Sequence, residues 1–311
     1  MKIVYLDSAT VGETPMDGIA ELGELVCWPE STPEEEALER VRDCNVLIVN
    51  KVLVTRALLD AAPELRLVCE AATGVNNIDL EACRERNIPV RNVAGYSTDS
   101  VVQTTFMHIL SLMGNAPYFD NTVKDGTYSK GTLFTDVSRP YIEIKGKRIG
   151  IVGMGAIGTG VARVAEAFGM EVVYYSTSGT GHCKEWPSIS LGELMRTSDV
   201  ISIHAPYNER TAGLIGAGEL AMMKPSAIIV NMGRGGIVDE AALAEVIDND
   251  LIGGAALDVF TKEPLPGDSP LLRTRHPEKL RFTPHTAWAS TEALTRLVNC
   301  IADNIRSEMG L

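Results

Sequence analysis

The first 95 residues alternate short apolar runs with amphipathic, helix-like stretches. The apolar runs have the length of buried strands and comprise Ile3–Leu6, Leu25–Trp28, Val46–Asn50, Leu67–Glu70 and Ile88–Arg91. Helical patterns lie between them, such as Pro33–Val41 after Thr32 and Leu80–Arg86 after Asp79, and Thr32 and Asp79 are favourable N-cap residues. Strands that alternate with helices predict a parallel sheet with helices on both faces.

The alternation stops in the middle of the chain and then resumes. A long helix is predicted from about Ser97 to Met113, and the polar stretch Asn121 to Lys147 is interpreted as an arm or a linker. Further strands are predicted at Ile149–Val152, Val172–Ser176, Val200–His204, Ala227–Asn231, Gly254–Leu257 and Leu280–Thr283. The last helix, Thr291 to Ser307, is amphipathic. The α/β pattern therefore predicts two doubly wound units, the second beginning near residue 100, with the last helix returning to the first.

Composition agrees with a globular protein and narrows its partners. The 311 residues suggest two domains at about 150 residues each. The formal net charge of −13 argues against a nucleic-acid surface, which needs clustered Lys and Arg. No apolar run approaches the ~18 residues of a membrane helix, and the N-terminus is typical of a strand instead of a signal peptide.

The cysteines indicate a reducing compartment. None of the six forms a CxxC pair, so the sequence contains no zinc-knuckle pattern and predicts no metal site. Cys27 and Cys69 lie in apolar strand-like runs, which predicts buried free thiols. We therefore expect a cytoplasmic protein without membrane or nucleic-acid partners.

A glycine-rich loop fits the dinucleotide-binding pattern G-x-G-x-x-G. It reads Gly153-Met154-Gly155-Ala156-Ile157-Gly158, follows the strand Arg148–Val152, and precedes a helix predicted over Thr159–Phe168. The glycines allow a tight turn, close approach of a pyrophosphate, and close packing of helix on strand, while the helix N-terminus offers N–H groups to the anion. The alternative is a glycine turn in an α/β protein that binds no cofactor.

The residue expected to hold the adenosine ribose is unusual. The fingerprint places an acidic residue about 20 residues after the loop. Ser176 stands there, followed by Thr177 and Ser178, and the nearest basic residues along the chain are His182 and Lys184. NAD is favoured as cofactor, and NADP stays an alternative because a hydroxyl does not repel a 2′-phosphate as a carboxylate does.

Two candidate catalytic residues follow predicted strands. Arg234 lies between glycines after Ala227–Val230, and its planar guanidinium suits a carboxylate, although a surface salt bridge would also explain it. His285 follows Leu280–Thr283 as a candidate acid for an alkoxide, with packing as the alternative. Glu263 and Asp258 are carboxylates that could support a charged histidine, although Glu263 alone could be a solvated loop acid.

These segments together resemble the D-isomer-specific 2-hydroxyacid dehydrogenases, from Ala72-Thr73-Gly74-Val75-Asn76-Asn77-Ile78-Asp79 to Pro284-His285. The resemblance implies two Rossmann-like domains with an interdomain cleft. The substrate-binding, flavodoxin-like domain would comprise residues 1–97 and 288–311, and the dinucleotide-binding domain residues 98–287. It also implies a homodimer in which the Asn115–Tyr141 region serves as an arm.

The resemblance assigns roles to residues of this sequence. Arg234 would orient the substrate carboxylate, His285 would donate the proton, and Glu263 would pair with His285. The substrate would also contact Thr73, Gly74, Val75 and Trp288. The implied cofactor-binding set is Thr104, Gly153, Gly155, Ala156, Ile157, Gly158, Ser176, His204, Ala205, Pro206, Thr211, Met232, Gly233, Arg234, Asp258 and His285.

The predicted reaction is hydride transfer from NAD(P)H to a small 2-keto acid, giving a D-2-hydroxy acid, with hydroxypyruvate or glyoxylate as the leading substrate. The presence of Trp288 three residues after His285 resembles the sequence pattern of the hydroxypyruvate and glycerate branch of this family. D-lactate or aryl-lactate oxidoreduction is the alternative within enzymes. A non-enzymatic scaffold that senses NAD(H), similar to the C-terminal binding corepressors, is the alternative from another class.

Overall fold

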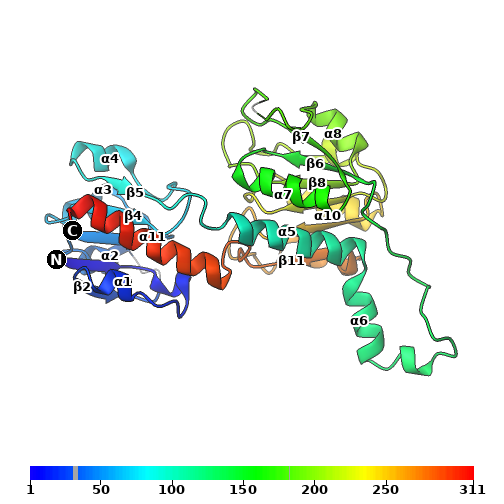
Figure 1. Cartoon of the computed structure of the whole chain (residues 1–311), viewed down its shortest axis with the longest axis horizontal. Coiled ribbons are helices and arrows are strands. Elements are labelled where there is room, and N and C mark those ends of the chain that lie inside the picture. The colour runs from blue at the N-terminus through cyan, green and yellow to red at the C-terminus, as the bar shows by residue number, and fades with distance from the viewer. Residues whose placement is uncertain (31–33, 182) are drawn as a thin grey trace. The chain divides into compact units, whose positions relative to one another are not determined.

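The computed structural model describes residues 1–30, 34–181 and 183–311, so the predicted Thr32 cap, Pro33 and His182 lie outside the described residues. The chain forms two compact units (Figure 1). Unit 1 comprises Met1–Ser97 and Ala289–Leu311, and unit 2 comprises Thr98–Trp288. Trp288 thus belongs to unit 2, one residue beyond the predicted boundary at 287.

Unit 1 contains a five-stranded parallel sheet in the order β2-β1-β3-β4-β5. Its strands are β1 (Lys2–Tyr5), β2 (Glu24–Cys27), β3 (Val46–Val49), β4 (Leu67–Glu70) and β5 (Val90–Arg91). Its helices are α1 (Asp17–Ala20), α2 (Glu34–Arg40), α3 (Arg56–Ala61), α4 (Leu80–Glu85) and α11 (Thr291–Met309), with a 3-10 turn at Ser8–Val11. This strand order is that of the flavodoxin-like doubly wound fold.

Local sequence signals explain several of these elements. The Asp79 carboxylate accepts a hydrogen bond from the Ala82 amide at 2.8 Å and caps α4, as predicted. The apolar stripe of α11 packs against α1 and β4, so the last helix returns to unit 1, as expected. The prediction that Cys27 is buried is wrong: β2 is an edge strand with little cover, and Cys27 is exposed.

Unit 2 contains a six-stranded parallel sheet in the order β11-β10-β9-β8-β6-β7. Its strands are β6 (Arg148–Val152), β7 (Glu171–Tyr175), β8 (Val200–Ile203), β9 (Ile228–Asn231), β10 (Gly254–Leu257) and β11 (Leu280–Phe282). Its helices are α5 (Thr98–Met113), α6 (Ala116–Lys124), α7 (Ala156–Ala167), α8 (Leu191–Thr197), α9 (Ala217–Leu220) and α10 (Glu240–Asp248). Short 3-10 turns lie at Tyr128–Lys130, Pro270–Arg273 and Pro277–Lys279.

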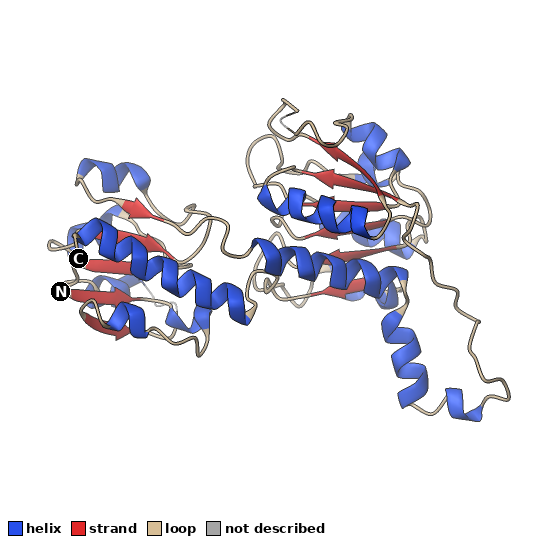
Figure 2. Cartoon of the chain, viewed as in Figure 1, coloured by secondary structure: helices blue, strands red, loops and turns tan. Residues whose placement is uncertain are grey.

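Helices cover both faces of the unit 2 sheet (Figure 2). One apolar cluster joins α5 and α7 to one face, and another joins α8, α9 and α10 to the other. β8, β9 and β10 are buried along their whole length. Strands buried on both faces lack polar alternation, which explains their continuous apolar runs.

The segment between α5 and β6 extends away from the sheet of unit 2 as an arm (Figure 1). Its first part is helical, because α6 continues to Lys124, so the predicted irregular stretch from Asn121 begins four residues too early. Beyond the turn at Tyr128–Lys130 the arm has no regular structure up to β6.

Among the helices that the structure describes, none combines the length and apolar character that a membrane span requires. Within the same described ranges, no group of three or more His, Cys, Asp or Glu side chains is arranged to hold a metal ion.

Candidate active site

Most of the predicted catalytic and cofactor-binding residues of unit 2 lie at the carboxyl ends of its strands. Gly153 follows β6, His204 follows β8, Arg234 lies just beyond β9, Asp258 follows β10, and His285 lies just beyond β11. All six strands are parallel, so these ends share one edge of the sheet. The chain order reverses between the neighbouring strands β6 and β8, and such a switch point is where open α/β sheets bind ligands.

The glycine loop has the geometry that a pyrophosphate needs. Gly153 has φ +95°, and a Cβ there would lie 2.9 Å from the Ala205 amide nitrogen. A Cβ on Gly158 would lie 2.2 Å from the Gly153 carbonyl oxygen, whereas nothing lies within 4 Å of a Cβ on Gly155. The first and third glycines therefore allow close backbone contact, and Gly155 leaves space for a ligand.

Helix α7 begins within this motif, at Ala156, with Gly155 as its N-cap. The predicted start at Thr159 was three residues late, because the glycines at 155 and 158 obscured the first turn. Ala156 and Ile157 consequently form that first turn, where backbone N–H groups have no partner within the helix. These residues fit the phosphates of a dinucleotide.

The loop after β8 forms the other wall of the switch point. The ring Nε2 of His204 lies 2.7 Å from the Ser202 hydroxyl oxygen, and burial lowers the pKa of His204 to about 3, so its ring is neutral. Its Nδ1 is buried without a hydrogen-bond partner among the described residues. A buried ring nitrogen without a partner is costly. The His204 Nδ1 is therefore a second feature, besides the space at Gly155, that fits a polar group of a bound ligand.

Thr211 supports this loop from inside. Its side chain is fully buried; its hydroxyl donates to the Pro206 carbonyl at 2.7 Å and accepts from the Asn208 amide at 2.9 Å. Ala205 is also buried, whereas Pro206 lines an open pocket. Thr211 was predicted to contact the cofactor. In the structure its hydroxyl stabilises the loop after β8.

The turn that carries Arg234 is fixed by the side chain of Asn231, the last residue of β9. The Asn231 Oδ1 accepts from the Gly233 amide at 3.0 Å, and its Nδ2 donates to the Arg234 carbonyl at 2.9 Å. Gly233 approaches Ala205, and a Cβ on Gly235 would lie 1.9 Å from the Phe260 carbonyl oxygen. The glycines around Arg234 therefore let three loops meet, and the arginine side chain is exposed at their junction.

Asp258 joins the loops after β10 and β11. It is 2% exposed, and its carboxylate accepts from the Thr283 hydroxyl at 2.6 Å and from the Thr286 and Ala287 amides at 2.9 and 3.1 Å. Because the Thr283 proton goes to Asp258, the ring Nε2 of His108, 3.2 Å from the same hydroxyl oxygen, must be the donor. His108 is buried on α5.

His285 and Glu263 form the expected pair. The ring Nδ1 of His285 lies 2.7 Å from the Glu263 Oε2, and the other carboxylate oxygen accepts from the Phe260 amide at 3.0 Å. The His285 backbone has φ +54°, and its amide donates to the Asp258 carbonyl at 2.7 Å. With Nδ1 bonded to Glu263, Nε2 is the ring nitrogen available to exchange a proton with a ligand.

Comparisons with known proteins decide the family. Residues 106–287 match the family model "D-isomer specific 2-hydroxyacid dehydrogenase, NAD binding domain". A putative 2-hydroxyacid dehydrogenase of Haemophilus influenzae is 36% identical, with 98% of this chain and 97% of that protein covered. The chain belongs to the D-isomer specific 2-hydroxyacid dehydrogenase family.

Two further proteins resemble this dehydrogenase over its whole length. The hydroxypyruvate reductase of Blautia hydrogenotrophica is 32% identical, with 98% of this chain and 96% of that protein covered. The solved structure of an acyclic imino acid reductase (Bsp5) in complex with NADPH and D-Arg has a TM-score of 0.86 at 29% identity, with coverage of 100% and 97%. The predicted family, two-unit α/β fold and oxidoreductase class are therefore confirmed.

The remaining predicted site residues of the dehydrogenase lie in different surroundings. Thr104 is half-buried on α5, and Met232 is 5% exposed beside the apolar cluster under β9. Ser176 lies directly after β7. Trp288 packs partly buried against the α5–α7 face of unit 2.

The Thr73–Val75 loop belongs to unit 1 and follows β4. The Thr73 hydroxyl donates to the Val93 carbonyl at 3.2 Å, and the Asn77 Nδ2 donates to the Val52 carbonyl at 3.1 Å and to the Glu70 Oε2 at 2.9 Å. The loop is thus anchored at both of its ends.

Sequence reasoning missed the supporting residues Asn231, Thr283 and Glu70. Asn231 and Thr283 stand at strand ends beside predicted site residues, so their position was a usable signal. Glu70 closes an apolar strand and is fully buried, which nothing in its sequence pattern indicated. Burial raises the pKa of Glu70 to about 8, although the hydrogen bond from Asn77 lowers it.

Replacing Gly158 with alanine should destabilise unit 2, because the new Cβ would press on the Gly153 carbonyl and force helix α7 off the loop. We expect the G158A variant to lose ~1–3 kcal/mol of unfolding free energy, typical of overpacking, and to bind NADH and NADPH more weakly. Chemical denaturation and cofactor fluorescence titration measure the two effects.

Gly218 provides the matched control for this change. It lies on helix α9, and nothing would lie within 4 Å of its Cβ. The G218A variant should keep native stability or gain a few tenths of a kcal/mol. Equal effects of G158A and G218A would contradict the close helix–loop contact.

Unit 1 should lose unfolding free energy as the pH rises toward the raised pKa of Glu70. The folded pKa of about 8 lies above the ordinary value of 4.5, so between these values the folded state binds more protons than the unfolded state and stability falls with pH. The Glu70→Gln variant removes this proton. Relative to the wild type it should gain at least ~1 kcal/mol between pH 5.5 and 8.5, since one pKa unit corresponds to ~1.4 kcal/mol.

Urea denaturation at the two pH values measures this gain. Glu13 is exposed in the same unit, and Glu13→Gln should show no pH-dependent gain. If Glu70→Gln follows the wild type at both pH values, Glu70 is ionised in the folded protein at neutral pH.

Proposed function

We propose that this dehydrogenase reduces a small 2-keto acid, with hydroxypyruvate or glyoxylate as the leading substrate, and that Arg234, Glu263 and His285 carry the chemistry. The observation behind this proposal is the 2.7 Å pair of His285 and Glu263 at the same sheet edge as an exposed arginine. The relative named hydroxypyruvate reductase supports the choice of substrate.

In the proposed reaction, bound NAD(P)H supplies a hydride to the carbonyl carbon of the keto acid. The guanidinium of Arg234 binds the carboxylate and polarises the carbonyl, for which its planar fork is suited. The His285 Nε2 donates the proton that the carbonyl oxygen takes up as it becomes a hydroxyl. Glu263 holds the ring by Nδ1 and stabilises its charged form.

Other residues contribute by position. Asp258 fixes the turn of His285, and Asn231 fixes the turn of Arg234. The backbone N–H groups of Thr73, Gly74 and Val75 are proposed to bind the substrate carboxylate as well. Gly153, Gly155 and the first turn of α7 are proposed to hold the cofactor pyrophosphate.

The proton donor can be tested by replacing His285 with alanine. Without general acid catalysis, keto-acid reduction should fall roughly 100-fold or more in kcat, with little change in cofactor affinity. Glu263→Gln keeps the hydrogen bond but not the charge, so it should lower kcat less and alter the pH profile of the rate. Stopped-flow and steady-state assays with hydroxypyruvate, glyoxylate, pyruvate and phenylpyruvate make these comparisons.

His276 offers a matched control, because it too lies beside carboxylates, those of Glu278 and Asp250, away from the proposed site. His276→Ala should retain wild-type turnover. Near-native turnover by His285→Ala would overturn the proposed mechanism. A wild-type chain that binds nucleotide but reduces no keto acid would instead favour the non-enzymatic scaffold, and preference for pyruvate or phenylpyruvate would favour the lactate-type alternative.

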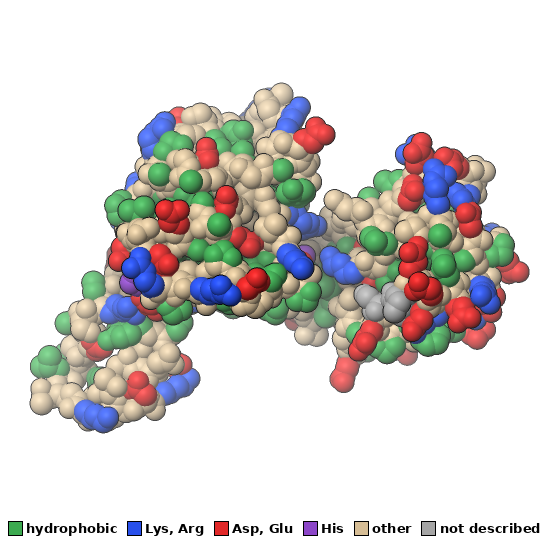
Figure 3. Space-filling model, turned by 180° about the vertical axis from the view of Figure 1, so that it is seen from behind, with side chains coloured by type: hydrophobic (Ala, Val, Ile, Leu, Met, Phe, Trp, Pro, Cys, Tyr) green, Lys and Arg blue, Asp and Glu red, His purple; other side chains and the backbone are tan. Residues whose placement is uncertain are grey.

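We also propose that the chain forms a homodimer through the arm. The arm carries the most exposed large apolar side chains of unit 2, with Phe134 90% and Val137 75% exposed, and Leu133 and Tyr141 are similarly uncovered. Figure 3 shows hydrophobic side chains along this projection. Several large apolar side chains exposed on one projecting segment are typical of a protein–protein interface.

A double substitution in the arm should dissociate the dimer. Charges at F134D and V137D would be buried unpaired in the interface, so sedimentation should change from a dimer to a monomer. The control L272D changes a 52% exposed leucine outside the arm and should stay dimeric. A monomeric wild type, or a dimeric double variant, would contradict an arm-mediated dimer.

A further inference from the structure

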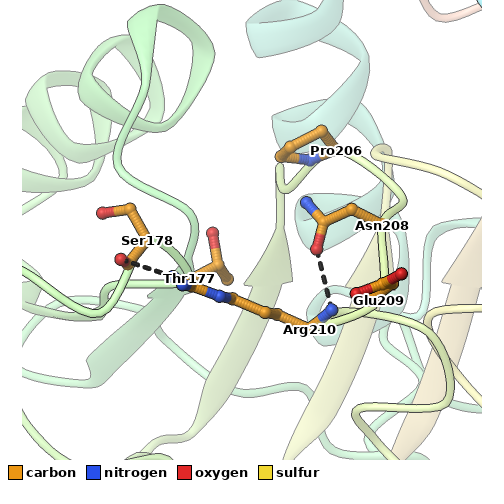
Figure 4. Close-up of a pocket in the computed structure, with 6 residues that line it drawn as sticks. All are labelled: Thr177, Ser178, Pro206, Asn208, Glu209 and Arg210. Carbon is orange, nitrogen blue, oxygen red and sulfur yellow. Dashed lines mark hydrogen bonds between the residues drawn. The ribbon is translucent and has the colours of Figure 1, made fainter.

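An open pocket lies between the loop after β7 and the loop after β8, on the two strands that flank β6. Its volume is ≈ 400 Å³. Figure 4 shows the residues that line it: Thr177, Ser178, Pro206, Asn208, Glu209 and Arg210. The glycine loop follows β6, so this pocket lies where the fingerprint places the adenosine ribose, at the end of the strand that follows the loop.

Arg210 spans the pocket from one loop to the other. Its Nη1 donates to the Ser178 carbonyl at 2.7 Å, across 32 residues of sequence (Figure 4). At its base, the Arg210 amide donates to the Asn208 Oδ1 at 2.9 Å, and buried Thr211 holds the same loop. Arg210 is thus held at its backbone amide and at its guanidinium. Within the described ranges no carboxylate forms a salt bridge with that guanidinium.

Two hydroxyl-bearing residues, Thr177 and Ser178, line the pocket beside the Arg210 guanidinium, and Ser176 lies next to Ser178. The Ser176 and Ser178 hydroxyl oxygens lie 3.0 Å apart, and the Ser176 hydroxyl donates to the Thr180 carbonyl at 2.6 Å. The carboxylate that would bind a ribose 2′-hydroxyl and repel a 2′-phosphate is absent from this position. A guanidinium beside hydroxyl donors is the chemistry that recognises a phosphate.

Among the described residues that line the pocket, Glu209 is the one acidic side chain. In Figure 4 its carboxylate points away from Ser178, whereas the Arg210 side chain extends toward Ser178 and Thr177. The Glu209 carboxylate therefore lies near the base of Arg210 and away from its guanidinium end, where Thr177 and Ser178 lie.

We propose that Arg210, together with Ser176, Thr177 and Ser178, binds the 2′-phosphate of NADP(H) and makes the enzyme prefer it over NAD(H). The inference rests on the proposed function, since it requires a dinucleotide bound along the glycine loop. Arg210 would then determine cofactor specificity from the loop after β8, whereas the sequence pattern points to Ser176 after β7.

Calorimetric titration with two mononucleotide probes tests this directly, without turnover. The full-length wild type should bind 2′,5′-ADP at least ~10-fold more tightly than 5′-ADP, because charge-assisted Arg–phosphate bonds are strong. Arg210→Ala should abolish this preference while changing 5′-ADP affinity less than ~3-fold, since only the phosphate contact is removed. Arg210→Lys should retain part of the preference, as a point charge without the fork.

Arg275→Ala is the matched control, because it removes the same charge from a residue beside Asp248 of α10, outside this pocket. It should bind both probes as the wild type does. Circular dichroism of each variant shows that the fold is retained. A parallel steady-state comparison should show a higher kcat/KM with NADPH than with NADH, and R210A should invert or level that ratio.

The outcomes separate the two proposals. A wild type that binds 5′-ADP at least as well as 2′,5′-ADP and reduces keto acids with NADH would overturn the role of Arg210 and leave the proposed reaction intact. An unchanged preference in R210A would also overturn it. A wild type that binds neither probe and has no turnover would overturn the proposed function itself.

Discussion

The candidate active site at the carboxyl ends of the unit 2 strands depends on one buried carboxylate, that of Asp258. It accepts hydrogen bonds from a threonine hydroxyl and two backbone amides, which offset the cost of burying a charged group. In return it fixes the turn after β11, where His285 adopts a left-handed φ of +54°. Such a backbone costs about 1–3 kcal/mol and persists only where its surroundings impose it. The ring position relative to Glu263 follows from this local constraint.

Close backbone contact is the second condition for this edge. The turns after β8, β9 and β10 approach until Gly233 and Gly235 have no room for a Cβ against Ala205 and Phe260. Three loops can therefore converge without large side chains between them, and the Arg234 side chain is exposed where they meet. The parallel sheet supplies the common edge, and the glycines let the loops above it share a small volume.

Much of this arrangement could be predicted from the sequence, because it is local. The buried parallel strands appear as apolar runs, the glycine spacing marks the phosphate loop, and each strand end carries its chemistry one to three residues later. The pairing of His285 with Glu263 came only through the family resemblance, since 22 residues separate them. The proximity of Arg210 to Ser178 was not predictable at all: it depends on β7 and β8 flanking β6, a fact of topology that periodicity does not contain.

The same topology explains how an acidic protein can select anionic ligands. The formal net charge is −13, and acidic and basic side chains are interspersed on the face shown in Figure 3. At physiological salt such fields are screened within ~8 Å, so charges at a distance contribute little to the choice of ligand. In the roles proposed above, Arg234 and Arg210 act at contact distance instead, and each is carried by the loop that follows a central strand. The proposed selectivity for a carboxylate and a phosphate thus rests on two loop arginines and not on overall charge.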